Sequence, residues 1–118
     1  MAKFSRGMKM NKPGDFTRVF RQAKRASGGG LTVLTVRNSV GRPRLGLAIA
    51  KKHIKLASNR NRLKRIIRES FRQHQSDFEN IDIVVLSRAD VVKQPSKQIW
   101  AALEQHWKTV VGQWQKES

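Results

Sequence analysis

The segment from residue 51 to residue 72 carries the side chains best suited to chemistry, because Lys and Arg crowd there beside a single acid, Glu69. Most of these cations are Arg, whose planar guanidinium can hold two phosphate oxygens at once. An ordinary solvated helix would mix both signs and pair Glu with Lys or Arg four residues away. One acid cannot balance so many like charges, so the segment indicates binding to an anion rather than a purely structural role.

Apolar residues recur at helical spacing within this segment and predict a helix from about Ala57 to His74. The residues on its predicted buried side are Leu63, Ile66, Ile67, Ser70 and Phe71. At about 100° per residue, the opposite side carries Asn61, Arg65, Arg68 and Arg72, with Arg62 and Lys64 on the flanks. One side of the helix would be anchored in a core while the other faces an anionic partner.

Residues that could make the protein itself a catalyst form no recognisable motif. A protein nuclease would need paired carboxylates for metal ions, or an acid–base pair such as two His residues. The eight acids are scattered, and His53, His74 and His106 lack metal-ligand spacing. The glycine run after Ser27 lacks the GxxxxGK[ST] pattern of a phosphate-binding loop, and cysteine is absent. We therefore expect the chain to be inactive by itself.

Length and charge narrow the classes of protein that remain. The 118 residues suffice for one domain, 1–118, with residues 1–12 as a flexible basic arm. The net charge is +17, and residues 1–72 contain 20 basic and 2 acidic residues. Such a field attracts nucleic acid or an anionic membrane. Because no apolar run approaches the roughly 20 residues of a spanning helix and no secretory signal is evident, we expect a cytoplasmic nucleic-acid-binding protein without a membrane partner.

The other elements indicate a single α/β domain in which helices pack on a small sheet. A short helix is predicted from about Pro13 to Lys24, followed by a flexible loop at Ser27–Gly30. The predicted strands are Leu31–Val36 and Leu45–Ala50, which could form an antiparallel hairpin, and Ile81–Leu86. A final helix begins near Pro95 and carries all three Trp residues, whose continuous apolar stripe indicates core packing.

Phe16 and Phe20 allow two interpretations. They lie four residues apart on the first predicted helix, so their rings share one side. That side could pack in the core, or it could offer a stacking platform to single-stranded bases beside the basic helix. The two roles are compatible, because a ring can line a groove while one of its sides is packed.

A long and irregular signature in this chain resembles that of the bacterial ribonuclease P protein subunit, over about residues 8–114. The segments that carry the resemblance are Lys51-Lys52, Ala57, Arg60–Arg72, Asp15–Phe20, Arg44–Leu47 and Ile81–Val85. The resemblance implies an α+β sandwich with a mostly antiparallel sheet and the order α-β-β-(β)-α-β-α. It also implies a left-handed βαβ crossover that carries the basic helix, whereas such crossovers are usually right-handed.

The same resemblance implies a function in transfer RNA processing. In that family an RNA subunit is the catalyst and cleaves precursor transfer RNA with Mg²⁺ to generate the mature 5′ end. The small protein binds the catalytic RNA and the 5′ leader of the precursor. By position, the residues implied at the catalytic RNA are Lys51, Lys52, Arg60, Asn61, Arg62 and Arg65, and those implied at the leader are Phe16, Phe20, Lys64 and Arg68.

One departure and two alternatives remain open. Some relatives carry an aromatic residue in the strand after the first loop, whereas Leu31–Val36 has none and the chain has no tyrosine. A ribosomal or RNA-chaperone protein would share the charge and the absence of catalytic motifs. A DNA-binding domain would place the basic helix in a major groove, although no helix-turn-helix pattern is present.

Overall fold

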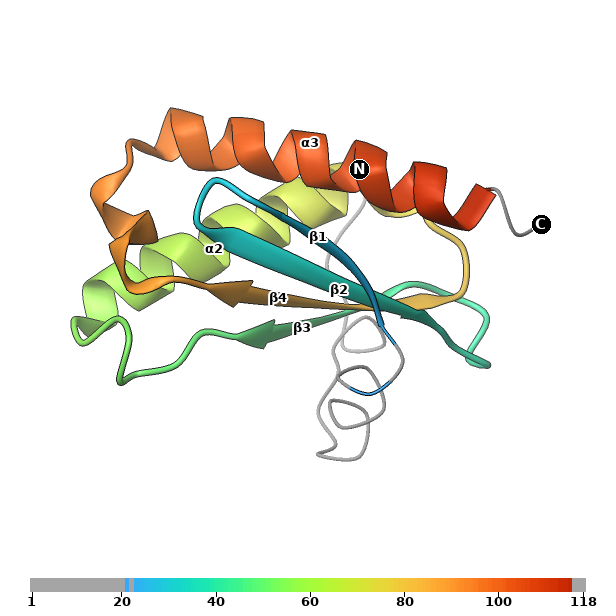
Figure 1. Cartoon of the computed structure of the whole chain (residues 1–118), viewed down its shortest axis with the longest axis horizontal. Helices are drawn as coiled ribbons and strands as arrows, with labels where there is room; N and C mark the ends of the chain where they lie inside the picture. The colour runs from blue at the N-terminus through green and yellow to red at the C-terminus, as the bar shows by residue number, and fades with distance from the viewer. Residues whose placement is uncertain (1–20, 22, 116–118) are drawn as a thin grey trace.

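The computed structural model describes residues 21 and 23–115, which form a four-stranded sheet with two long helices on one of its faces (Figure 1). The elements, in chain order, are β1 Lys24–Gly28, β2 Leu31–Arg37, β3 Arg44–Ala48, α2 Ala57–His74, η2 Gln75–Asp77, β4 Ile81–Ser87, η3 Ala89–Lys93 and α3 Ser96–Gln115. Within the described residues, no helix is long and apolar enough to cross a membrane.

The basic helix and two of the predicted strands form where the sequence places them. Helix α2 has the predicted bounds, and the five residues expected on its buried side are its buried residues. Strands β2 and β4 extend one residue beyond their predicted ends, and β3 is shifted by one or two residues. Apolar side chains at helical spacing specified α2, and runs of β-branched and apolar residues specified the strands.

The spatial order of the strands is β1-β2-β4-β3, which corrects the predicted hairpin of β2 and β3. Strand β4 lies between them, antiparallel to β2 and parallel to β3. Its residues Ile81 to Val85 are all buried, as expected for a central strand covered on both faces.

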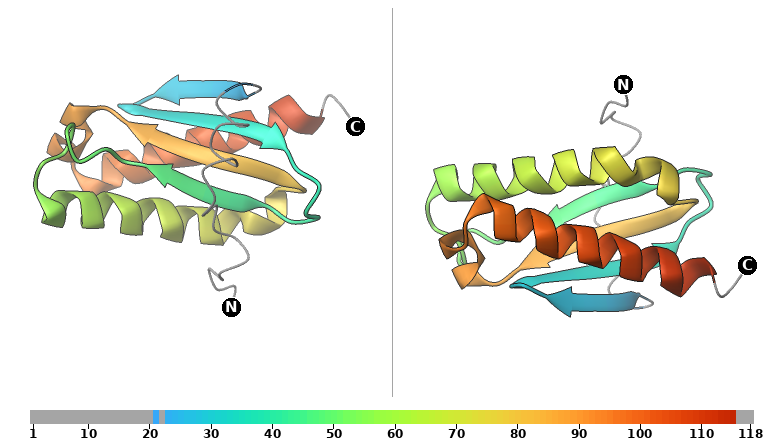
Figure 2. Two further views of the ribbon diagram at one scale, coloured as in Figure 1. Left: turned by 90° about the horizontal axis from the view of Figure 1, so that it is seen from below. Right: turned by 90° about the horizontal axis from the view of Figure 1, so that it is seen from above.

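The chain leaves β3, crosses the sheet through α2 and returns as the neighbouring parallel strand β4. In the left view of Figure 2, β3 and β4 both point to the left, the helices lie behind the sheet, and the chain passes upward from β3 to β4. This path is a left-handed crossover, the rare hand that the resemblance implied. It places α2 over the β3 side of the sheet and α3 over the β1 side (Figure 2).

The prediction was wrong for residues 24–30. Lys24 begins β1 instead of ending a helix, and Gly29-Gly30 form a tight turn between β1 and β2 instead of a flexible loop. Both glycines have positive φ, at +64° and +82°, as a two-residue hairpin turn requires. The Gly29 and Gly30 carbonyls accept hydrogen bonds from the Gln94 side chain and the Arg88 amide, so the turn is fixed against the segment around η3.

The main core lies between the sheet and the helices and contains an aromatic cluster of Phe71, Phe78 and Trp107. The indole N–H of Trp107 donates to the Ser70 hydroxyl at 2.8 Å, so its buried donor is satisfied. The other two Trp residues, Trp100 and Trp114, are half-buried against this core, which agrees with the predicted packing role. A smaller cluster of Leu34, Val36 and Val84 lies on the other face of the sheet.

Candidate nucleic-acid interface

Ten of the described cations lie in two segments at one end of the molecule. The loop after β3, the start of α2 and η3 all lie at this end in both views of the ribbon (Figures 1 and 2). Residues 51–65 and 88–97 are termed the basic end. Asp90 is the only acid within these two segments. Other acids, including Asp77 and Glu79, follow the far end of α2. The positive charge is therefore concentrated where α2 begins.

Four of the predicted RNA-contact residues are open to solvent. Lys51 and Lys52 lie in an exposed turn after β3, and Asn61 and Arg65 lie on the exposed side of α2. None of these four side chains has a hydrogen bond or ion pair within the described part of the chain. They are placed to meet a partner from outside.

Arg60 is half-buried and binds its own loop. Its Nη1 donates to the carbonyl oxygens of Ile54 and Lys55, at 2.7 and 2.9 Å. The Ile54 side chain is buried, so these bonds fix the exposed Lys51–Lys55 turn to both the core and the first turn of α2. Arg60 therefore holds other cations in place.

Arg62 makes the equivalent contact on the opposite flank of the helix. Its Nη2 donates to the Val92 carbonyl at 2.7 Å, and its Nη1 donates to the Ser96 hydroxyl at 3.1 Å. These bonds connect α2 to η3 and to the first turn of α3. The sequence placed Arg62 on a flank of the helix among the residues implied at the catalytic RNA, and the structure shows that its side chain also cross-links α2 to η3 and α3.

Three further cations of α2, Lys64, Arg68 and Arg72, are half-buried. Lys64 and Arg68 follow Arg60 at spacings of four residues, so these three cations share the flank away from Arg62. Arg72, expected on the solvent side, is 20% exposed and pairs with Glu69 at 2.7 Å. The single acid of the helix thus neutralises its last arginine and leaves the N-terminal half positive.

A buried ionic network, which the sequence did not reveal, joins the starts of β3 and β4, at the end of the sheet away from the basic end (Figure 1). Asp82 of β4 is fully buried and accepts two bonds from Arg44 of β3, each 2.7 Å long. Asn38, at the end of β2, donates to the same carboxylate at 2.8 Å and to the Arg42 carbonyl at 3.0 Å. Alternation along β4 puts Asp82 on the face away from the helices, since its neighbours Ile81 and Ile83 belong to the main core.

His74 forms a second polar link, at the last residue of α2. One ring nitrogen lies 3.2 Å from an Asp77 oxygen, and the other lies 2.8 Å from an oxygen of Glu104 on α3. Partial burial disfavours the charged ring, but the hydrogen bonds and charges of Glu104 and Asp77 outweigh it and raise the pKa of His74 above 6.5. The two carboxylates therefore favour the protonated form of the ring.

This raised pKa predicts that the link stabilises the fold mainly in acid. A raised native pKa gives stability that is fully present below about pH 6.5 and is lost as the pH rises through the native pKa. The difference in unfolding free energy between the unaltered protein and His74→Gln should thus be larger at pH 5.5 than at pH 8.5. Urea unfolding at both values measures this difference, and adding Glu104→Gln should reduce its pH dependence. Equal differences at the two pH values would contradict the assignment.

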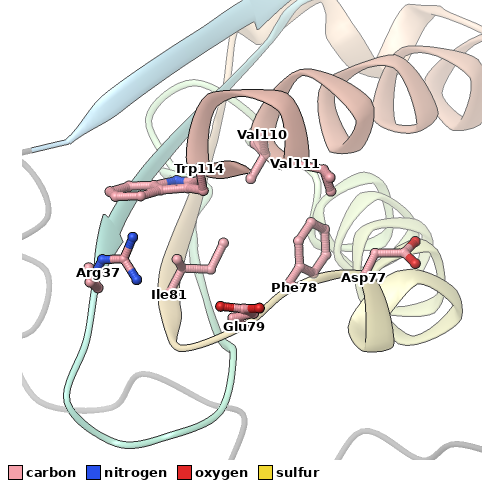
Figure 3. Close-up of a pocket in the computed structure, with 8 residues that line it drawn as sticks. All are labelled: Arg37, Asp77, Phe78, Glu79, Ile81, Val110, Val111 and Trp114. Atoms are coloured by element: carbon pink, nitrogen blue, oxygen red, sulfur yellow. The ribbon is translucent and has the colours of Figure 1, made fainter. Parts of the chain in front are cut away.

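A pocket of about 110 Å³ lies at the other end of the molecule, between the end of α3 and the residues that precede β4 (Figure 3). Phe78, Ile81 and Trp114 line it with Arg37, Asp77 and Glu79. The Arg37 guanidinium lies 5.2 Å from the centre of the Trp114 ring. Because the charged residues around this pocket are of both signs, it does not extend the basic end.

Comparison with known proteins assigns the chain to a family. The family model described as Ribonuclease P matches residues 4–111. The chain belongs to the Ribonuclease P family. Its relatives in this family include the ribonuclease P protein component of Pectobacterium atrosepticum, 44% identical over 89% of this chain and 88% of that protein. The corresponding protein of Nitrosococcus oceani is 43% identical over 93% of this chain and 92% of its own length.

Solved ribonuclease P protein structures share the fold. The RNase P protein of Staphylococcus aureus superposes with a TM-score of 0.81 at 31% identity, over 87% of this chain and 94% of that one. The protein of Thermotoga maritima gives a TM-score of 0.75 at 26% identity, over 86% of this chain and 96% of that one. The α+β architecture expected from the signature is thereby confirmed.

Two of the predicted ribonuclease P site residues, Phe16 and Phe20, lie outside the described residues. The basic arm 1–12 and most of the first predicted helix lie outside them as well. Within the described part of the chain, no group of three or more His, Asp or Glu side chains could hold a metal ion.

Proposed function

We propose that this chain is the protein subunit of ribonuclease P, which binds the catalytic RNA and promotes cleavage of precursor transfer RNA at the mature 5′ end. The observation that carries this proposal is the basic end of a Ribonuclease P family chain. Exposed Asn61 and Arg65 lie there on a helix anchored in the core, and exposed Lys51 and Lys52 lie in the turn that precedes it. Cations on a rigid element can match a fixed pattern of RNA phosphates without first being ordered.

The proposed roles of the protein and of the catalytic RNA follow from their opposite charges. RNA segments repel each other, and the protein would supply cations that offset this repulsion where the segments meet. The RNA would be the catalyst and would hold most of the Mg²⁺, while this chain acts as an accessory subunit of the endoribonuclease. Lys64 and Arg68, with Phe16 and Phe20, are proposed to bind the 5′ leader, and Lys51, Lys52, Arg60, Asn61, Arg62 and Arg65 to form the side toward the catalytic RNA.

The interior contacts of Arg60 and Arg62 refine their proposed roles. A guanidinium that already donates to backbone carbonyls has fewer N–H groups left for phosphate. Arg60 and Arg62 are therefore proposed to act mainly by fixing their neighbours, whereas Asn61 and Arg65 contact the RNA directly.

Reconstitution tests the proposed function. Purified protein should cleave no precursor transfer RNA alone, but should restore cleavage by the catalytic RNA at Mg²⁺ concentrations at which that RNA alone is slow. Cleavage by RNA-free protein, or no effect on the RNA, would overturn the proposal. The alternative of a ribosomal or chaperone protein would leave precursor cleavage unchanged, and RNA captured with the protein from cells would then be mainly ribosomal.

A further inference from the structure

We infer that Lys93 and Lys97 form a second phosphate-binding strip, on η3 and the first turn of α3, and that Arg62 positions this strip beside α2. The inference rests on the proposed function, because it assigns a second surface to the same catalytic RNA. The signature of residues 51–72 does not include these two lysines, which come from the last third of the chain.

The two lysines are exposed and lie among few acids. Lys93 ends η3, and Lys97 is the second residue of α3. From residue 91 to residue 103 the chain has no Asp or Glu. The nearest acid before them, Asp90, lies 3.8 Å from Arg88 and is matched by that charge. Lys93 and Lys97 therefore add net positive charge to the basic end.

The segment that carries these lysines is held from three sides. Val91 is fully buried in the main core. The Gln94 side chain donates to the Gly29 carbonyl at 2.9 Å, and the Arg88 amide donates to the Gly30 carbonyl at 2.9 Å. Arg62 holds the segment from the third side, by donating to the Val92 carbonyl and the Ser96 hydroxyl. Such anchoring leaves little conformational freedom to lose when a phosphate binds.

The contacts of Arg62 connect the two surfaces. Its partners, Val92 and Ser96, each immediately precede one of the two lysines in sequence. Both ribbon views place η3 beside the start of α2 (Figures 1 and 2). One RNA bound across the exposed side of α2 can therefore reach this strip as well. Arg62 is a positioning residue here, because it acts through the segment it holds.

The test measures how affinity for the catalytic RNA varies with salt. Each lost phosphate contact should lower the log–log slope by roughly 1, so Lys93→Ala with Lys97→Ala should lower it by about 1–2. Between 50 and 200 mM salt, the advantage of the unaltered protein should then shrink by about 4- to 16-fold. The melting temperature should hardly change, since both side chains are exposed.

Two single variants make the outcomes distinct. Lys108→Ala removes an exposed lysine from the same helix, near Asp77 and His74, and should leave the slope unchanged. Arg65→Ala tests the α2 surface of the proposed function and should lower the slope by about 1. Suppose that Arg65→Ala lowers the slope, but the double change of Lys93 and Lys97 alters it no more than Lys108→Ala does. The strip is then overturned and the proposed function stands. If Arg65→Ala also has no effect, the proposed α2 interface fails too.

The positioning role of Arg62 needs its own measurement. Arg62→Lys keeps the charge, but one ammonium cannot reproduce the forked pair of bonds. If Arg62 acts through the strip, removing Lys93 and Lys97 should reduce the slope less in the Arg62→Lys background than in the unaltered protein. Equal reductions in both backgrounds would show that Arg62 has no part in positioning the strip.

Discussion

Replacing Asp82 with Ala is expected to destabilise the fold by about 3–5 kcal/mol, the usual consequence of removing one partner from a buried ion pair. The Asp82 carboxylate is fully buried, accepts both forked bonds of Arg44 and accepts a further bond from Asn38. The Arg44 side chain is only 16% exposed, so its charge would lose its counter-ion in a place that water reaches poorly.

Equilibrium unfolding in urea measures this loss, and Asp90→Ala provides the matched control. Asp90 also lies near an Arg, but at 3.8 Å and with both side chains mostly exposed. Such surface pairs contribute about 0–1 kcal/mol, so this variant should unfold almost like the unaltered protein. A cost for Asp82→Ala as small as that for Asp90→Ala would mean that the network does not hold β3 to β4.

Replacing Gly29 with Ala is expected to cost about 2–5 kcal/mol, from two separate effects. The backbone has φ +64°, a conformation that costs an L-residue about 1–2 kcal/mol. An added Cβ would also lie 2.7 Å from the Cβ of Ala102, so the hairpin turn or α3 would have to shift, at about 1–3 kcal/mol.

Gly41→Ala separates these two effects. Gly41 has a comparable φ of +86°, but nothing lies within 4 Å of the added Cβ. Its variant should therefore show the backbone cost alone, and the difference between the two unfolding free energies gives the cost of the contact with Ala102. Equal losses for the two variants would refute close packing of the turn on α3.

Sequence patterns predicted where the helices and strands lie better than they predicted which strands pair. Helix α2 forms over the predicted residues because apolar side chains recur at helical spacing from Leu63 to Phe71. Strand β1, Lys-Arg-Ala-Ser-Gly, has no β-branched residue and forms because β2 pairs with it. The position of β4 between β2 and β3 depends on pairing across distant parts of the chain, which local periodicity does not encode.

The candidate site shows a different limit of sequence reasoning. A guanidinium donates equally well to a phosphate oxygen and to a backbone carbonyl, so the spacing of Arg60, Asn61 and Arg62 could not separate partner contacts from internal ones. The distances from the Arg62 guanidinium to the Val92 carbonyl and the Ser96 hydroxyl show that Arg62 makes internal contacts. The RNA contacts assigned to the site residues all stay predictions: Phe16, Phe20, Lys51, Lys52, Arg60, Asn61, Arg62, Lys64, Arg65 and Arg68.

The central place of β4 also sets the order in which this chain can fold during synthesis. The hairpin of β1 and β2 closes over a two-residue turn, but β2 pairs with β4 as far apart as Leu31 and Ser87. Strand β3 lies at the sheet edge with β4 as its neighbour, so it cannot join the sheet before β4 has been synthesised. On a ribosome, most of the cations would therefore emerge before the strand that completes the sheet. Until then the nascent chain is a polycation beside ribosomal RNA, and the arrival of β4 completes the sheet on which α2 and the basic end are held.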